Sequence, residues 1–220
     1  MTARHHDAAM NRSETWRAIH AERRRLVDDL TDLPDHRWRT TSLCGDWTVE
    51  QVVAHLTAGA LETRWRWIRS VVAARFDFDL HNRRRLGEHL GSTPAETLRN
   101  FDRARISTSA PSGHHWAWLG EIVVHGEDIR RPLGIVNLTP PEVSREIARH
   151  FVAKDFTVQS KTHATGLRLR ATDIQFEQGD GPEVAGPALS LLMALAGRSG
   201  HLVDLDGPGI ERLDEAISSG

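Results

Sequence analysis

A glutamate and a histidine four residues apart, Glu121 and His125, are the first residues of this chain whose types and spacing suggest chemistry. In a helix this spacing puts both side chains on one face, with Cβ atoms about 5–6 Å apart. A carboxylate oxygen and an imidazole nitrogen both bind divalent metal ions, so the pair could hold one ion. Asp128 and Trp118 extend the same face. The spacing is also common on solvated helix faces, so position in the fold must decide.

His55 is the candidate third ligand. It lies near the end of the largely apolar run VEQVVAHL, where a polar side chain that only faces solvent is less expected. Helical bundles build metal sites from inward side chains on facing helices. Two imidazoles and one carboxylate would give a catalytic zinc its three protein ligands and leave one position open. A zinc ion with one carboxylate ligand would leave the site with a charge of +1, which a bound thiolate would neutralise. The spacing of the residues does not show whether the open position takes a thiol or a water molecule that the metal activates.

Four helices are predicted to position these residues, because apolar residues recur at spacings of three and four. The predicted helices span residues 12–31, 48–74, 93–105 and 114–130. Thr48 and Thr93 are predicted N-caps, each followed three residues later by the Gln or Glu of a capping box. Pro132 and Gly134 are expected to close the fourth helix. Residues 1–135 are therefore predicted to form a four-helix bundle.

The composition changes between residues 132 and 140, where we predict a domain boundary. One further helix is expected within 137–156, and alternation of apolar and polar residues over 167–177 predicts strands. Residues 179–182 (GDGP) are typical of a turn, and 186–198 predict a short apolar helix ending at Gly197. The expected fold class is mainly α with an α+β C-terminal part, the small α+β domain spanning residues 136–220.

The composition excludes several classes of function. The 220 residues carry a net charge of −2 and a pI of about 6.7, so no basic surplus favours nucleic acid. No stretch approaches the ~18 apolar residues of a membrane span, and the polar N-terminus predicts no signal peptide. With the single cysteine Cys44 no intrachain disulfide can form, and a reducing, cytoplasmic setting is expected.

Three residues near the candidate ligands allow alternative interpretations. Cys44, just before the second helix, could be a reactive thiol, although a packed, inert cysteine is favoured. His114, seven residues before Glu121, could be a spare ligand or proton carrier, although surface capping is favoured. Asp128 could hold a ligand histidine in one tautomer, or it could pair with the arginines that follow it.

The segments WTVEQVVAHL (47–56) and GEIVVHGEDIRRPLG (120–134) resemble the two signature segments of the mycothiol-dependent maleylpyruvate isomerase family, a branch of the DinB-like four-helix bundles. The resemblance implies that His55, Glu121 and His125 bind a divalent metal, usually zinc. It also implies mycothiol, a low-molecular-weight thiol whose sulfur meets the metal. Arg198, in the segment LAGR, corresponds to the arginine that serves the substrate in the isomerase.

The expected function is thus metal-dependent activation of mycothiol as a thiolate, which adds to a small electrophilic substrate. The product would be an isomer, as in maleylpyruvate isomerase, or the adduct itself, as in a thiol S-transferase. A hydrolase on the same site is an alternative, as is a non-catalytic regulatory module whose metal is closed by His114 or Asp128. The expected partners are the thiol and the small substrate, with the protein a monomer or homodimer.

Overall fold

The computed structural model describes residues 9–61, 87–110, 113–156 and 158–219. The chain divides into two compact units, one comprising Arg12–Asn137 and the other Leu138–Gly220 together with Met1–Asn11. The first unit is helical, and the second combines helices with a three-stranded sheet. The predicted fold class, mainly α with an α+β C-terminal part, is therefore confirmed.

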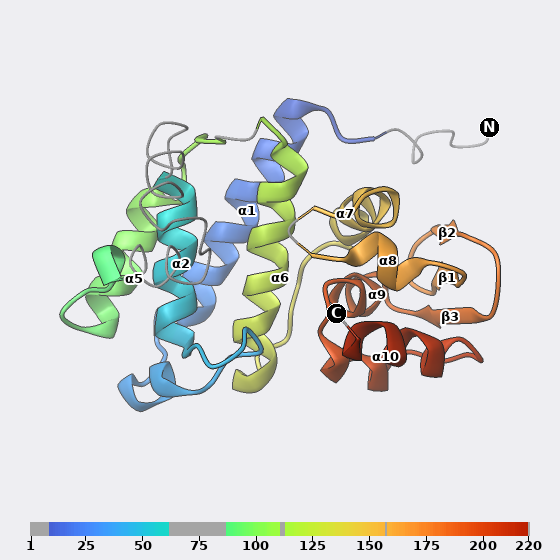
Figure 1. Ribbon diagram of the computed structural model, residues 1–220. Coiled ribbons are helices and arrows are strands. Elements are labelled where there is room, and N and C mark those ends of the chain that lie inside the picture. Colours follow the sequence, from blue (N-terminus) through green and yellow to red (C-terminus); the bar gives the residue numbers. More distant parts are fainter. Residues whose placement is uncertain (1–8, 62–86, 111–112, 157, 220) are drawn as a thin grey trace, which may run out of the picture. The chain divides into compact units, whose positions relative to one another are not determined.

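The first unit is a bundle of helices that run alongside one another (Figure 1). Its helices within the described residues are α1 (Arg12–Leu30), α2 (Val49–Leu61), α5 (Pro94–Ala104) and α6 (His115–Leu133). Helices α1 and α2 each pack against both α5 and α6. The predicted second helix is described as far as Leu61, and the rest of residues 48–74 lies outside the described residues. Apolar side chains from all four helices form the core: Ile19, Leu26, Val52, Val53, Phe101, Leu119, Ile122 and Ile129.

The predicted N-caps fix where α2 and α5 begin. Before α2, the Thr48 amide donates to Gln51 Oε1 (2.9 Å) and the Gln51 amide to Thr48 Oγ1 (3.3 Å), which confirms the capping box. Before α5, Thr93 Oγ1 accepts from the Glu96 amide at 3.3 Å. The Glu96 carboxylate reaches one residue further back and accepts from the Ser92 amide at 2.7 Å. Both helix starts are thus set by local side-chain bonds.

The end of α6 differs from the prediction. Pro132 lies inside the helix, and Gly134, at φ 65°, ends it one residue after Leu133. Because proline has no N–H, the Asp128 carbonyl loses its helical donor. The Leu43 amide replaces that donor at 3.0 Å. The helix therefore tolerates Pro132, and the loop between the 3-10 helix η1 (Asp35–Arg39) and α2 is tied to α6.

The second unit is built around an apolar helix. Its helices are α7 (Pro141–Ala153), α8 (Ser160–Ala164), α9 (Ala188–Leu195), the 3-10 helix η2 (Ser199–Asp204) and α10 (Ile210–Ser218). Helix α9 packs against α7, α8, η2 and the sheet, so residues 190–195 are buried on every side. Helices α7 and α9 match the predictions, whereas α8 was not predicted. Among the described helices, none combines the length and apolar character that crossing a bilayer requires.

The sheet has the order β2–β1–β3, made of β1 (Arg168–Ala171), β2 (Glu177–Gln178) and β3 (Glu183–Gly186). Strand β1 is antiparallel to β2 and parallel to β3. The period-two pattern holds in β1, where alternate side chains are buried. The sequence did not predict β3, because its four residues are too few to show a period.

Candidate metal centre

His55, on α2, lies near both Glu121 and His125, on α6. His55 Nε2 is 3.7 Å from Glu121 Oε1, and the His55 and His125 rings meet edge to face with centroids 5.1 Å apart. The side chains of His55, Glu121 and His125 are 19%, 25% and 17% exposed. Residues about 70 positions apart in sequence thus meet in a partly shielded place, which spacing alone could not establish.

This donor set suits zinc. Zinc binds imidazole nitrogen and carboxylate oxygen at about 2.0–2.2 Å, so two ligands of one tetrahedral ion lie about 3.3–3.5 Å apart. The 3.7 Å between His55 Nε2 and Glu121 Oε1 is close to that separation. The His55–Glu121 pair therefore has a separation close to that of two ligands of one zinc ion.

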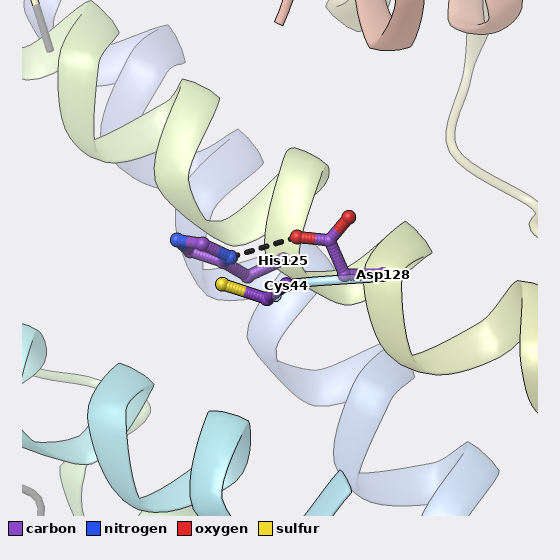
Figure 2. Close-up of side chains that lie close together, drawn as sticks. All are labelled: Cys44, His125 and Asp128. Atoms are coloured by element: carbon purple, nitrogen blue, oxygen red, sulfur yellow. Dashed lines mark hydrogen bonds and ion pairs between the residues drawn. The ribbon is translucent and has the colours of Figure 1, made fainter. Parts of the chain in front are cut away.

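Asp128 orients the His125 ring. His125 Nδ1 lies 2.9 Å from Asp128 Oδ2, and Asp128 is fully buried (Figure 2). A carboxylate on Nδ1 fixes the tautomer and leaves Nε2 as the nitrogen for a metal. Of the two interpretations of Asp128, the structure contains the bond to His125. The neighbouring Arg130 pairs with Asp29, with Nε 2.7 Å from Oδ2.

Cys44 lies beside the same histidine. Among the described residues, the potential ligand atoms of Cys44, His125 and Asp128 fall within 4.8 Å of one another. Figure 2 shows the Cys44 sulfur next to the His125 ring. The loop is fixed there because the Cys44 amide donates to Ser42 Oγ at 3.1 Å. The sequence favoured an inert cysteine, whereas the structure puts a soft metal ligand within reach of the site.

The length of the His125–Asp128 contact separates these two groups of donors. At 2.9 Å it has the length of a hydrogen bond and is shorter than the separation of two ligands of one zinc ion. Asp128 is therefore hydrogen-bonded to His125, and in the described part of the chain the possible ligand atoms that lie within 4.8 Å of one another belong to Cys44, His125 and Asp128. The ligand set His55, Glu121 and His125 stays a prediction.

The surroundings of His125 favour its charged form when no metal is bound. Burial lowers the pKa of His125, but hydrogen bonds and charge from Asp128 and Cys44 outweigh burial and raise that pKa to about 10. A metal ion must therefore displace a proton from His125, which makes metal affinity depend on pH.

Two further residues shape the site and were missed in the sequence. The Trp47 ring lies against His55, with centroids 5.1 Å apart. Gly59 lies one turn after His55, and a Cβ there would be 2.4 Å from Glu121 Oε1 and 3.3 Å from Trp118 Cζ3. Glycine destabilises a helix interior by about 1 kcal/mol relative to alanine. The Glu121 carboxylate fills the space that Gly59 leaves. A lone glycine within the helical pattern was the sequence feature that could have indicated this close approach.

The remaining candidates lie elsewhere. Arg198 belongs to the second unit, directly before η2, and its Nη1 donates to the Ala196 carbonyl at 2.7 Å. Its role toward a substrate stays a prediction. His114 occupies the N-cap position of α6, but its side chain makes no capping bond and its ring lies against Trp116. His114 therefore occupies the predicted position at the start of α6, but its side chain does not cap the helix.

The described residues form a helical bundle and a small α+β unit, and this arrangement fits the DinB-like helical fold. Residues 16–111 match the family model described as the mycothiol maleylpyruvate isomerase N-terminal domain, which confirms the resemblance stated above. This match includes His55 and ends before Glu121 and His125.

Solved structures agree on the fold. The crystal structure of the mycothiol-dependent maleylpyruvate isomerase gives a TM-score of 0.65 at 14% identity. That of a histidine-to-alanine mutant of this isomerase gives 0.63 at 13% identity. Each alignment covers 90% of this chain and 93% of the other. No curated protein matches this chain in sequence.

Proposed function

We propose that this protein is a metal-dependent enzyme that uses mycothiol as a thiolate nucleophile toward a small electrophilic substrate. The observation that carries the proposal is the approach of His55 to two side chains of α6: its Nε2 is 3.7 Å from Glu121 Oε1, and its ring centroid is 5.1 Å from that of His125. The match of residues 16–111 to the isomerase family's N-terminal domain supports mycothiol as the thiol.

The residues of the site have distinct tasks. His55, Glu121 and His125 would hold the metal, zinc being the usual one in the family. When bound, such an ion keeps a thiol deprotonated at neutral pH. Glu121 supplies the one negative charge of the ligand set, and Asp128 keeps the Nδ1 proton of His125 in place. Trp47 covers one side of the His55 ring and limits its rotation.

The chemistry follows from the nucleophile. The thiolate sulfur donates an electron pair to an electrophilic carbon of the substrate and forms a C–S bond. If the substrate is a conjugated alkene, rotation about the resulting single bond and loss of the same thiolate give the isomer. If the adduct is released instead, the reaction is an S-transfer. Arg198 is proposed, from the family resemblance, to hold negative charge on the substrate.

A turnover assay tests this proposal. The zinc-loaded protein is incubated with maleylpyruvate, with and without mycothiol, and product formation is followed by absorbance. Turnover is expected only with the thiol, and Glu121→Gln is expected to lower it at least about 100-fold because the ligand charge is lost. Glu142→Gln, an exposed position on α7, serves as the control. Equal turnover without any thiol would instead identify a metal-dependent hydrolase.

A second candidate, a non-catalytic metal-binding module, is favoured by one observation. The potential ligand atoms of Cys44, His125 and Asp128 lie within 4.8 Å of one another, so Cys44 could close the coordination of a metal ion. In that case Cys44→Ser would lower zinc content sharply and no thiol-dependent turnover would be found. An enzyme with an open coordination position keeps its zinc in Cys44→Ser.

A further inference from the structure

The Glu121 carboxylate of α6 lies against a glycine of α2. A Cβ at Gly59 would be 2.4 Å from Glu121 Oε1 and 3.4 Å from Glu121 Cδ, so a residue without a side chain leaves the room that the carboxylate occupies. The same oxygen is 3.7 Å from His55 Nε2, one turn earlier on α2. The place of Oε1 beside His55 therefore depends on what surrounds Gly59.

The Trp118 ring borders this place as well. A Cβ at Gly59 would be 3.3 Å from Trp118 Cζ3, so the ring and the carboxylate adjoin the same point of α2. Trp118 precedes Glu121 by three residues on α6, a spacing that puts both side chains on one face of the helix. Gly59 from one helix and Trp118 from the other thus both border the Glu121 carboxylate.

Two unfavourable features meet here. Glycine in the interior of α2 weakens the helix relative to alanine. Trp118 Nε1 is shielded from solvent and has no hydrogen-bond partner in the described part of the chain, which is also destabilising for a buried donor. Departures of this kind are expected at functional sites, where another benefit offsets them. Both belong to residues that border the Glu121 carboxylate.

We infer that Trp118 is a positioning residue: its ring, together with the backbone at Gly59, holds the Glu121 carboxylate with Oε1 toward His55. This inference deepens the proposed function and rests on its ligand set. A free glutamate side chain rotates about several bonds, and fixing them on a metal costs conformational entropy. A carboxylate already confined by the ring and the glycine loses less freedom, so the metal binds more tightly. The indole itself supplies no ligand atom.

Packing of the hydrophobic core alone explains less. The core residues Leu119, Ile122 and Ile129 of α6 are at most 2% exposed, whereas Trp118 is only half-buried. A core role also gives no reason for a glycine beside the ring, since a larger side chain would fill that space better. Confinement of the carboxylate accounts for both the ring and the glycine.

The zinc affinity of two tryptophan variants, measured by competition with a chelator, tests the inference. Trp118→Ala should lower the affinity about tenfold, because the carboxylate is no longer confined. Trp116→Ala is the matched control: this indole lies two residues earlier on the chain, its ring lies against His114, and its loss should leave the affinity unchanged. Urea unfolding shows whether each variant is folded.

A second background separates positioning from a general loss of structure. If Trp118 acts through Glu121, Trp118→Ala should cause no further loss of affinity in a Glu121→Ala protein, where no carboxylate is left to hold. The visible absorption of Co²⁺ bound in place of zinc gives an independent readout, because it depends on the ligands of the ion. Trp118→Ala should change this spectrum when Glu121 is present and leave it unchanged in Glu121→Ala.

Fluorine NMR tests the same contact if Trp118→Ala does not fold. In protein grown with tryptophan fluorinated at Cζ3, the Trp118 signal is identified by its loss in Trp118→Phe. Addition of Zn²⁺ should shift that signal in the unaltered protein, because the carboxylate beside Cζ3 becomes a ligand. The same addition should leave the signal unshifted in Glu121→Ala.

The outcomes separate this inference from the proposed function. Unchanged zinc affinity in Trp118→Ala overturns it, as does the same loss of affinity with and without Glu121, or a fluorine signal that zinc does not shift. Unchanged zinc affinity in Glu121→Ala contradicts the ligand set and the proposed function with it. Zinc affinity that falls in Glu121→Ala and persists in Trp118→Ala contradicts only the positioning role.

Discussion

Two pairs of shielded polar side chains, one pair from each unit, have different kinds of partner. In the second unit Ser160 and His163 bond to the backbone: Ser160 Oγ donates to the Phe151 carbonyl at 3.0 Å, and His163 Nδ1 lies 2.8 Å from the Leu195 carbonyl. In the bundle, His55 and Glu121 come from different helices and lie 3.7 Å apart, facing each other rather than the backbone.

This difference helps to distinguish a histidine that could bind a ligand from one that only stabilises the fold. Both units contain a partly or fully buried histidine, so neither the abundance of histidine nor its burial identifies a ligand. His163 is engaged by a carbonyl of its own unit and stabilises the fold. His125 is held by the Asp128 carboxylate on Nδ1 and has the Cys44 thiol beside its ring, so its neighbours are side chains rather than the backbone.

Removing one histidine from each unit gives the largest expected contrast. His125→Ala should abolish zinc binding, because one of three ligands is lost, while His163→Ala should keep the zinc and lower the free energy of unfolding by about 2 kcal/mol. Zinc is measured by mass spectrometry of the dialysed protein and stability by urea unfolding. Full zinc content in His125→Ala would disprove the ligand set.

The carboxylates behind the histidines give the second contrast. Asp128→Asn should lower zinc affinity by about 10- to 100-fold, because the amide orients the His125 ring less firmly and makes it a weaker base. Asp204, whose Oδ2 lies 3.4 Å from His201 Nδ1, is the matched position in the second unit. Asp204→Asn should leave zinc affinity unchanged in a chelator competition. Equal affinities for both variants would show that Asp128 has no part in metal binding.

A methyl group added to each unit gives the third contrast. Gly59→Ala places a carbon 2.4 Å from Glu121 Oε1, so the carboxylate must move, and zinc affinity should fall about tenfold. The fold should persist, because alanine favours the helix. Gly200→Ala, where a Cβ would meet nothing within 4 Å, is the control. Chelator competition and circular dichroism distinguish displacement of Glu121 from unfolding, and unchanged affinity would mean that Glu121 is not a ligand.

The smallest expected effect concerns stability in the second unit. Asp155 accepts hydrogen bonds from the Lys161 and Thr162 amides at the start of α8, at 2.8 and 3.1 Å. Slight burial opposes ionisation, but these bonds and that from the Thr162 hydroxyl lower the pKa of Asp155 below its ordinary 3.8. Because the folded pKa is depressed, the stabilisation is present above pH 3.8 and lost as pH falls through the folded value.

Asp155→Asn should therefore lower stability by about 0.5–1 kcal/mol at pH 7 and by less as the pH approaches 3. Urea unfolding at a series of pH values measures the difference, and zinc content should not change. A difference that does not depend on pH would show that the charge of Asp155 is irrelevant.

Local patterns in the sequence predicted much of the fold. Helix periodicity located α1, α2, α5 and α6, and capping residues located two of their starts, because these signals depend only on neighbours in the chain. Strand β3 was missed because four residues between turns carry too little pattern. The pairing of Glu121 with His125 was equally local, since it follows from the helix repeat.

The rest of the site depends on contacts between distant segments. His55 was indicated as the third ligand by its apolar setting and by the resemblance to known signature segments. Neither could give its distance from Glu121, because that distance depends on how the helices pack. The contact of Cys44 with His125 and the fit of Glu121 over Gly59 are of the same kind. The spacing of apolar residues does not show which distant segments of the chain contact one another.

The proline inside α6 has a consequence for how the site is assembled. Pro132 frees the Asp128 carbonyl, and the Leu43 amide binds there, 85 positions earlier in the chain. Closing so long a loop is slow relative to forming a local turn. The segment that carries Cys44 and Trp47 is therefore held in place only when this long-range contact with α6 has formed.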